Sequence, residues 1–237
     1  MTALPWLDST SHWFPDPETA LDDPDGLLAI GGDLHPDRIL QAYSQGIFPW
    51  FSDDQPILWW SPDPRCVLVP SRVHISRSLR RKLNQNRLRI SVDCAFREVI
   101  HACGALRAEG TWITQDMEQA YCHLHDLGHA HSFEAWTPEG QLVGGLYGVA
   151  IGKAFFGESM FSLERDASKV VFVHVARQLE RWGYHLMDCQ VENDHLLSMG
   201  AERIPRSDFL SIIRESVQCQ PGHEWRMDWH WGAEADP

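Results

Sequence analysis

Residues 153–162, KAFFGESMFS, place one carboxylate inside an otherwise apolar strand pattern. Burying an unpaired charge costs several kcal/mol, so the carboxylate of Glu158 must be paired, or its pKa must be shifted for a functional role. Two other strand candidates, HSFEAWTP and QLVGGLYGVAIG, precede this segment, with the turn residues Pro138, Glu139 and Gly140 between them. The pattern therefore predicts three sequential strands, the last of which carries a polar group.

The spacing of the apolar residues changes directly after these three strands. Apolar side chains now recur at helical spacing, which indicates an amphipathic helix that Asp166 caps and Gly183 ends, with a stripe of Val171, Val175, Leu179 and Trp182. The segment YHLMDCQV, residues 184–191, then has the pattern of a returning strand. We expect this strand to lie beside the one that holds Glu158.

The upstream and downstream segments complete an α+β fold. RCVLVP and LRISVD have strand patterns, and the basic stretch up to about Leu83 has a helical one; two helices, a later short helix and a final strand follow the same rules. Residues 1–63 are dense in proline and turn formers, and His35 is a poor N-cap for the helix that starts at Pro36. We expect a small irregular N-terminal α/β domain at 1–63 and a larger domain at 64–237.

Alternation within YHLMDCQV sorts its side chains onto two faces. His185, Met187, Cys189 and Val191 share one face, and Leu186, Asp188 and Gln190 share the other. Residues two apart on a strand lie about 7 Å apart, so Asp188 and Gln190 project together. An ordinary solvated face would give this pattern, but Glu158 on the neighbouring strand converges with them on Leu146, Phe155 and Met160. An apolar hollow with a few convergent polar groups is typical of a ligand site.

Charge is distributed unevenly along the chain. The formal net charge is −13, yet residues 70–91 hold seven basic side chains and no acidic one: Arg72, Arg77, Arg80, Arg81, Lys82, Arg87 and Arg89. A charge run is often only a solvated face. Against so acidic a background, this run would also serve as a docking surface for phosphates.

Other sequence features favour few additional sites. The six cysteines form no C-x-x-C pair, and the histidines of HLHDLGHAH divide at Gly128 between two elements, so we expect reduced thiols and no metal site. No apolar run reaches the roughly 18 residues that cross a bilayer, and the first residues lack the pattern of a secretory signal. We therefore expect no membrane association and a cytoplasmic location.

Several motifs together resemble a known family. IFPWFSDDQPILWWSPDPR, EGTWIT, LGHAHSFEAW, LVGGLYGVAIG, FGESMFS and LMDCQVENDH match, in order and spacing, the bacterial leucyl/phenylalanyl-tRNA–protein transferases. The resemblance implies a GNAT-like acyltransferase domain. It also implies transfer of Leu, Phe or less readily Met from aminoacyl-tRNA to the N-terminal Arg or Lys of a protein, which marks that protein for degradation by the N-end rule. The C-terminal segment HEWRMDWHWGAEADP has no place in the match.

The resemblance also implies roles for individual residues. Asp188 and Gln190 correspond to the family's proposed catalytic pair, and Glu158 would help to fix the aminoacyl group. Trp50 and Trp112 would stack on the terminal adenosine, since base stacking on an aromatic side chain is worth about 1 to 3 kcal/mol. The expected substrate-binding set is Trp50, Trp112, Leu146, Phe155, Met160 and Asn193; Arg72, Arg77, Arg80, Arg81 and Lys82 would hold the tRNA.

Two other function classes fit parts of the sequence. A GNAT-like acetyl-CoA enzyme would need a glycine-rich loop before its central helix, where this chain has the acidic linker SLERDAS. A non-catalytic tRNA-binding module would use the basic run but would not need Glu158, Asp188 or Gln190. We expect an enzyme that needs no cofactor and acts as a monomer.

Overall fold

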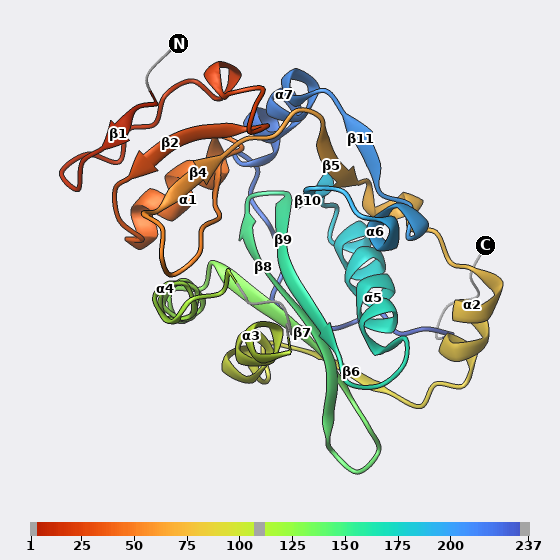
Figure 1. Cartoon of the computed structure of the whole chain (residues 1–237). Helices are drawn as coiled ribbons and strands as arrows, with labels where there is room; N and C mark the ends of the chain where they lie inside the picture. The colour runs from red at the N-terminus through yellow and green to blue at the C-terminus, as the bar shows by residue number, and fades with distance from the viewer. Residues whose placement is uncertain (1–3, 107–111, 233–237) are drawn as a thin grey trace.

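The computed structural model describes residues 4–106 and 112–232 and contains two β-sheets (Figure 1). The smaller sheet has four strands in the order β1-β2-β4-β3. It lies at the N-terminal end, with helix α1 (Pro36–Ser44) beside it. Its strands are β1 (Trp6–Leu7), β2 (Leu27–Gly31), β3 (Phe48–Pro49) and β4 (Leu58–Trp60).

The larger sheet has seven strands in the order β11-β5-β10-β9-β8-β7-β6. Neighbouring strands are antiparallel except for the pair β9 and β10, which runs parallel. The helix that joins this parallel pair crosses one face of the sheet, as a parallel connection requires. The strands are β5 (Arg65–Leu68), β6 (Arg89–Val92), β7 (Ala130–Trp136), β8 (Leu142–Ile151), β9 (Ala154–Ser162), β10 (Leu186–Gln190) and β11 (Glu202–Ile204).

Helices cover both faces of the larger sheet. Figure 1 shows α3 and α4 on one side and α5 with α2 on the other. The core is accordingly divided into two clusters, with Val99 and Tyr121 in one and Val171 and Leu179 in the other. The remaining helical bounds are η1 (Pro17–Thr19), η2 (Pro70–Arg72), α2 (Arg77–Asn84), α3 (Phe96–Ala105), α4 (Gln115–Asp126), α5 (Ala167–Arg181), α6 (Asp194–Ser198) and α7 (Arg206–Ser216).

Two consecutive glycines in β8 allow these helices to approach the sheet closely. A Cβ atom on Gly144 would lie 2.8 Å from Cβ of Ala167 at the start of α5. On the opposite face, a Cβ atom on Gly145 would lie 3.0 Å from a methyl carbon of Val99 on α3. Because successive strand residues face opposite ways, one Gly-Gly pair makes room for both helices.

The structure confirms a mixed α/β architecture consistent with the α+β prediction. The predicted stripe of α5 is buried, and Gly183, with φ 72°, follows the end of that helix as predicted. Two details were wrong. The basic stretch forms the short turn η2 and then α2, which begins only at Arg77. Asp166 precedes α5 with φ 65° and makes no side-chain cap bond.

Candidate active site

A cavity of about 310 Å³ opens where the two parallel strands part. Strand β10 pairs with β9 only from Leu186 to Asp188, opposite Ala154 to Phe156. The residues that follow on each strand line the cavity, together with β3 and the residue after it, Trp112, Met187 of β10, one residue of β8 and the start of α6. The full lining is Phe48, Pro49, Trp50, Trp112, Leu146, Gly157, Glu158, Ser159, Met160, Met187, Cys189, Gln190, Val191, Glu192, Asn193 and Leu196.

Each of the two strands has a register shift at the cavity. In β9, Gly157 pairs with Gly148 and Ser159 with Tyr147, so Glu158 is one extra residue. In β10, Asp188 pairs with Val67 and Gln190 with Cys66, so Cys189 is extra. Bulges of this kind redirect side chains and occur often next to active sites. Here they direct Glu158, Cys189 and Gln190 to one cavity.

Glu158 accepts three hydrogen bonds from three different elements. Tyr43 on α1 donates to Oε1 at 2.6 Å, Tyr121 on α4 donates to Oε2 at 3.1 Å, and Nε2 of Gln190 donates to Oε1 at 3.0 Å. Burial raises the pKa of Glu158 to about 7, and the tyrosine hydrogen bonds oppose that rise. Glu158 therefore changes its protonation state near neutral pH.

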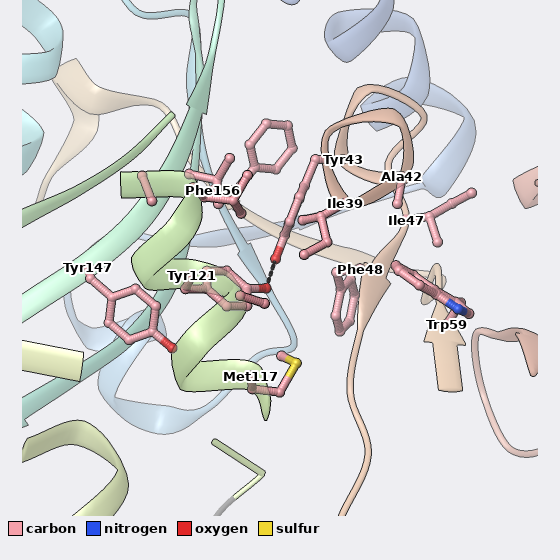
Figure 2. Close-up of a cluster of buried hydrophobic side chains, with 14 of the residues drawn as sticks. Ile39, Ala42, Tyr43, Ile47, Phe48, Trp59, Met117, Tyr121, Tyr147 and Phe156 are labelled. Atoms are coloured by element: carbon pink, nitrogen blue, oxygen red, sulfur yellow. Dashed lines mark hydrogen bonds between the residues drawn. The ribbon is translucent and has the colours of Figure 1, made fainter. Parts of the chain in front are cut away.

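The two tyrosines form the wall behind Glu158. Figure 2 shows their hydroxyl groups directed at one another, and the two oxygens lie 2.5 Å apart. Both side chains are fully buried, among apolar residues that include Phe156. Burial raises the pKa of each tyrosine well above its usual value, so each hydroxyl keeps its single proton and donates it either to the carboxylate or to the other hydroxyl.

Asp188 lies behind the cavity and does not line it. Arg65 on β5 binds its carboxylate through Nε at 2.9 Å and Nη2 at 2.7 Å, and neither side chain is exposed. The expectation that Asp188 and Gln190 project together into the hollow was therefore wrong for Asp188, because Arg65 occupies its carboxylate. Asp188 instead accepts the backbone N–H of Gln190 at 3.0 Å.

Gln190 is the predicted polar residue that reaches the cavity from β10. Its φ of 54° lies in the left-handed region, an uncommon conformation for a residue other than glycine. The bond from its backbone N–H to Asp188 and the bond from Nε2 to Glu158 hold this conformation. Because Nε2 is bound to a carboxylate, the amide oxygen Oε1 is the group that remains for a substrate.

Five of the six predicted substrate-binding residues line the cavity: Trp50, Trp112, Leu146, Met160 and Asn193. Phe155 does not. It is fully buried, and its ring lies 6.0 Å from the ring of Phe133 in the core on the α5 side. Its neighbours Leu146 and Met187 in the same core cluster face the cavity, so Phe155 supports the wall from behind.

The indole of Trp50 stands at the edge of the cavity. It is 42% exposed, and its ring lies 5.8 Å from that of Trp60. Nε1 of Trp60 donates to the backbone oxygen of Trp50 at 2.7 Å, which fixes the loop that carries it. Trp112 is half-buried; Glu109, Gly110 and Thr111 of the EGTWIT motif lie outside the described residues.

The sequence reasoning missed three residues that hold the site: Tyr43, Tyr121 and Arg65. The tyrosines lie on helices far from β9 in the sequence, and no local pattern connects them. Arg65 could have been found, because it opens the apolar strand RCVL and is fully buried there. A charge within a buried strand must be paired, and this holds for the guanidinium of Arg65 as it does for the carboxylate of Glu158.

The predicted tRNA-binding residues lie mainly on α2. Leu79 and Leu83 anchor this helix, and Arg77, Arg80 and Arg81 are exposed. Lys82 is half-buried on the same helix. Arg72 in η2 pairs with Glu202 at 3.1 Å on the surface. No helix within the described ranges is long and apolar enough to cross a membrane.

The family models and the relatives with similar sequences carry the same family name. Residues 67–214 match the sequence model "Leucyl/phenylalanyl-tRNA protein transferase", and residues 32–63 match the model of that family's N-terminal domain. A protein of Hahella chejuensis named leucyl/phenylalanyl-tRNA–protein transferase is 58% identical over 96% of this chain and 97% of its own. One of the same name from Nitrosospira multiformis is 54% identical over 95% of this chain and 97% of its own.

Two solved structures resemble this chain distantly. The structure of L-PGS from Bacillus licheniformis aligns with a TM-score of 0.41 and 11% identity, over 70% of this chain and 53% of that one. A similarity at this level carries no conclusion about fold or function.

Proposed function

The chain belongs to the leucyl/phenylalanyl-tRNA–protein transferase family, and on this premise we propose that it transfers Leu, Phe or less readily Met from aminoacyl-tRNA to the N-terminal Arg or Lys of acceptor proteins. The new peptide bond marks the acceptor for degradation. The observation that carries this proposal is the cavity between β9 and β10, where Gln190 and Glu158 meet a partly apolar wall.

The donor's aminoacyl group occupies the apolar part of this cavity. Leu146, Met160 and Met187 line it with aliphatic and thioether surface, which suits a bulky uncharged side chain. Trp50 and Trp112 contact the terminal adenosine at the entrance, because a purine stacks well on an indole.

The acceptor amine approaches Gln190. An α-amine has a pKa of about 7.7 to 8.0, so on the order of a tenth is already neutral near pH 7. The carbonyl oxygen of Gln190 accepts a hydrogen bond from this amine and directs its lone pair at the ester carbon. Holding amine and ester in line can supply about 7 to 11 kcal/mol of the barrier. The ester is already activated, so the reaction needs no cofactor.

The two carboxylates have different tasks in this proposal. Glu158 fixes the amide of Gln190 and is the cavity-lining group whose pKa, about 7, suits proton exchange with the amine. Asp188 positions Gln190 through its backbone N–H and, paired with Arg65, touches no substrate. It is a positioning residue.

The body of the tRNA contacts the exposed cations Arg72, Arg77, Arg80 and Arg81, with Lys82 beside them. Contacts of this kind bind phosphates without reading the base sequence, which suits an enzyme that accepts several tRNAs. This location for the tRNA is supported by the local charge of α2 in an otherwise acidic chain.

The domain division and the remaining expectations belong to the same proposal. A boundary near residue 63 is supported by the ends of the two family matches at residues 63 and 67 and by the separate small sheet. The second part, 64–237, is proposed as a GNAT-like domain, supported by the parallel pair β9 and β10 that separates at the cavity. We propose a cytoplasmic location, because aminoacyl-tRNA is present in the cytoplasm, and a monomer, because residues of one chain line the cavity.

One experiment tests the central claim. The protein is incubated with Leu-tRNA and with peptides that differ only in their first residue, and products are identified by mass. We expect peptides that begin with Arg or Lys to gain one leucyl group. No mass gain on any peptide would contradict the proposal, and acetylation in the presence of acetyl-CoA would favour the other acyltransferase class.

A further inference from the structure

The segment after α7 forms an extended strap, residues 223–232. Trp225, Met227, Trp229 and Trp231 are half-buried, while the residues between them are exposed. This alternation means that every second side chain docks against the body of the protein.

The first part of the strap packs against the core residues that support the cavity wall. Trp225 stacks on His131 with ring centroids 3.4 Å apart, and its edge meets Phe133. Its ring also lies 6.5 Å from that of Phe155, which supports the cavity wall. Stacked and edge-on aromatic pairs of this type add stability beyond the area they bury.

The middle of the strap is fixed to α5 through one buried amide. Oε1 of Gln178 accepts the backbone N–H groups of Asp228 and Trp229 at 3.1 and 3.0 Å. Its Nε2 donates to Oδ1 of Asp228 at 2.5 Å, and Arg181 donates to Oδ2 at 3.2 Å. The backbone of the strap therefore has a defined register on α5.

The end of the strap contacts the basic helix α2. Nε1 of Trp231 donates to Oδ1 of Asn84 at 2.8 Å. The guanidinium of Arg80 lies over the same indole, 5.4 Å from the ring centroid. The rest of α2 is anchored by two buried side chains, Leu79 and Leu83. One indole thus contacts both the last turn of α2 and a central arginine of its basic face.

We infer that Trp231 is a positioning residue for tRNA: the strap holds α2 and the guanidinium of Arg80 in the orientation that binds the phosphates of the donor tRNA. This inference rests on the proposed function, which assigns α2 to the tRNA. The contacts that support it are those of Trp231 with Asn84 and with the exposed Arg80, which lie on the charged helix and not in the core.

The test compares two donors with the variant Trp231→Ala. We expect binding of full-length Leu-tRNA to weaken about fivefold, which is about 1 kcal/mol at 1.4 kcal/mol per tenfold. Transfer from a short aminoacyl-adenosine, which does not reach α2, should be unchanged. Asn84→Ala should show the same selective loss, and Trp231→Phe, which keeps an aromatic ring under Arg80 but loses the N–H, should show a smaller one.

Two results would overturn the inference. Unchanged tRNA affinity in both Trp231→Ala and Asn84→Ala would show that the strap does not position α2. An equal loss with tRNA and with the short donor would show a general effect on the fold. Trp13→Ala, which removes a largely exposed indole from the N-terminal part, is the matched control and should affect neither donor.

Charge reversal on α2 separates this inference from the proposed function. If Arg77→Glu with Arg81→Glu weakens tRNA binding and Trp231→Ala does not, the inference alone is wrong. If the charge reversal itself has no effect, α2 is not the tRNA surface and the proposed location of the tRNA is wrong.

Discussion

Arg65 and Asp188 form a fully buried ion pair directly behind the candidate active site, with two hydrogen bonds of 2.9 and 2.7 Å. The guanidinium also donates to the backbone oxygen of Gly46 at 3.1 Å and lies against the rings of Phe48 and Phe209. The pair therefore connects β5 and β10 to the loop before β3 and to α7. Asp188 has its charge satisfied without any substrate.

Removing one partner of this ion pair should strongly destabilise the folded protein. Asp188→Ala would leave a buried guanidinium without its carboxylate, and breaking a buried pair in this way costs about 3 to 5 kcal/mol. We expect the free energy of unfolding, measured by urea denaturation, to fall by that amount. Transfer should fall as well, because the backbone N–H of Gln190 loses its acceptor.

A double variant separates the structural role of the pair from its positioning role. Arg65→Met with Asp188→Leu replaces both charges with apolar side chains and should recover much of the lost stability. We expect transfer to remain at least tenfold below the unchanged protein, since small misplacements of reacting groups can cost about a hundredfold. Full recovery of transfer would show that the pair is only structural.

The pH dependence of transfer should report Glu158. Its carboxylate accepts Nε2 of Gln190 when ionised and loses part of that capacity when protonated, with a pKa of about 7. We expect kcat/KM for the acceptor peptide to rise through pH 7 and again through the amine pKa of about 7.7 to 8.0. Glu158→Gln should remove the lower inflection and keep the upper one. A lower inflection that survives this substitution would assign it to another group.

The free energy of unfolding should also depend on the protonation of Glu158, but it should fall as the pH rises, whereas transfer should increase. Burial raises the pKa of Glu158 from 4.5 to about 7, so the folded state favours the neutral form. The unfolded chain ionises first, so this contribution to stability is complete below about pH 4.5 and is lost as the pH rises through 7. Urea denaturation of Glu158→Gln at pH 5 and pH 8 should show a smaller decrease between these pH values than the unchanged protein.

Much of the larger sheet could be predicted from local pattern. Strand alternation and helical period identified β7, β8, β9, α5 and β10, and the position of β10 beside β9 was correct. The side-chain directions at the cavity were less predictable, because each strand gains one residue there. Simple alternation placed Asp188 and Gln190 in the same hollow, and the bulge at Cys189 with the Arg65 pair separates them.

The groups around Glu158 could not be predicted from the sequence because they come from distant parts of the chain. Tyr43 is 115 residues from Glu158 and Tyr121 is 37 residues away. A carboxylate within a buried strand needs partners, and only the packing of α1 and α4 against the sheet identifies those of Glu158. Phe155 illustrates the reverse error: an aromatic side chain near a polar motif was assigned to the cavity, and it belongs to the core.

Trp50 should contribute most to the binding of a short aminoacyl-adenosine donor. Its partly exposed indole lies at the cavity entrance, and stacking of one base is worth about 1 to 3 kcal/mol. We expect Trp50→Ala to raise KM for an aminoacyl-adenosine about tenfold or more, and to affect full-length tRNA less because α2 still binds it. Steady-state transfer to a labelled Arg-peptide measures both. Normal use of the short donor by Trp50→Ala would refute the stacking role.

Charge reversal on α2 should change the salt dependence of tRNA binding. Arg77 and Arg81 are exposed on the basic face of this helix, in a chain with a net charge of −13. Each phosphate contact adds nearly one unit to the slope of log K against log salt concentration, so Arg77→Glu with Arg81→Glu should reduce the slope by about two. Filter binding of Leu-tRNA at several salt concentrations measures this slope. Arg165→Glu with Arg214→Glu, which changes two exposed arginines outside α2, makes the same change in net charge and is the control; equal slopes in the two variants would exclude α2 as the contact surface.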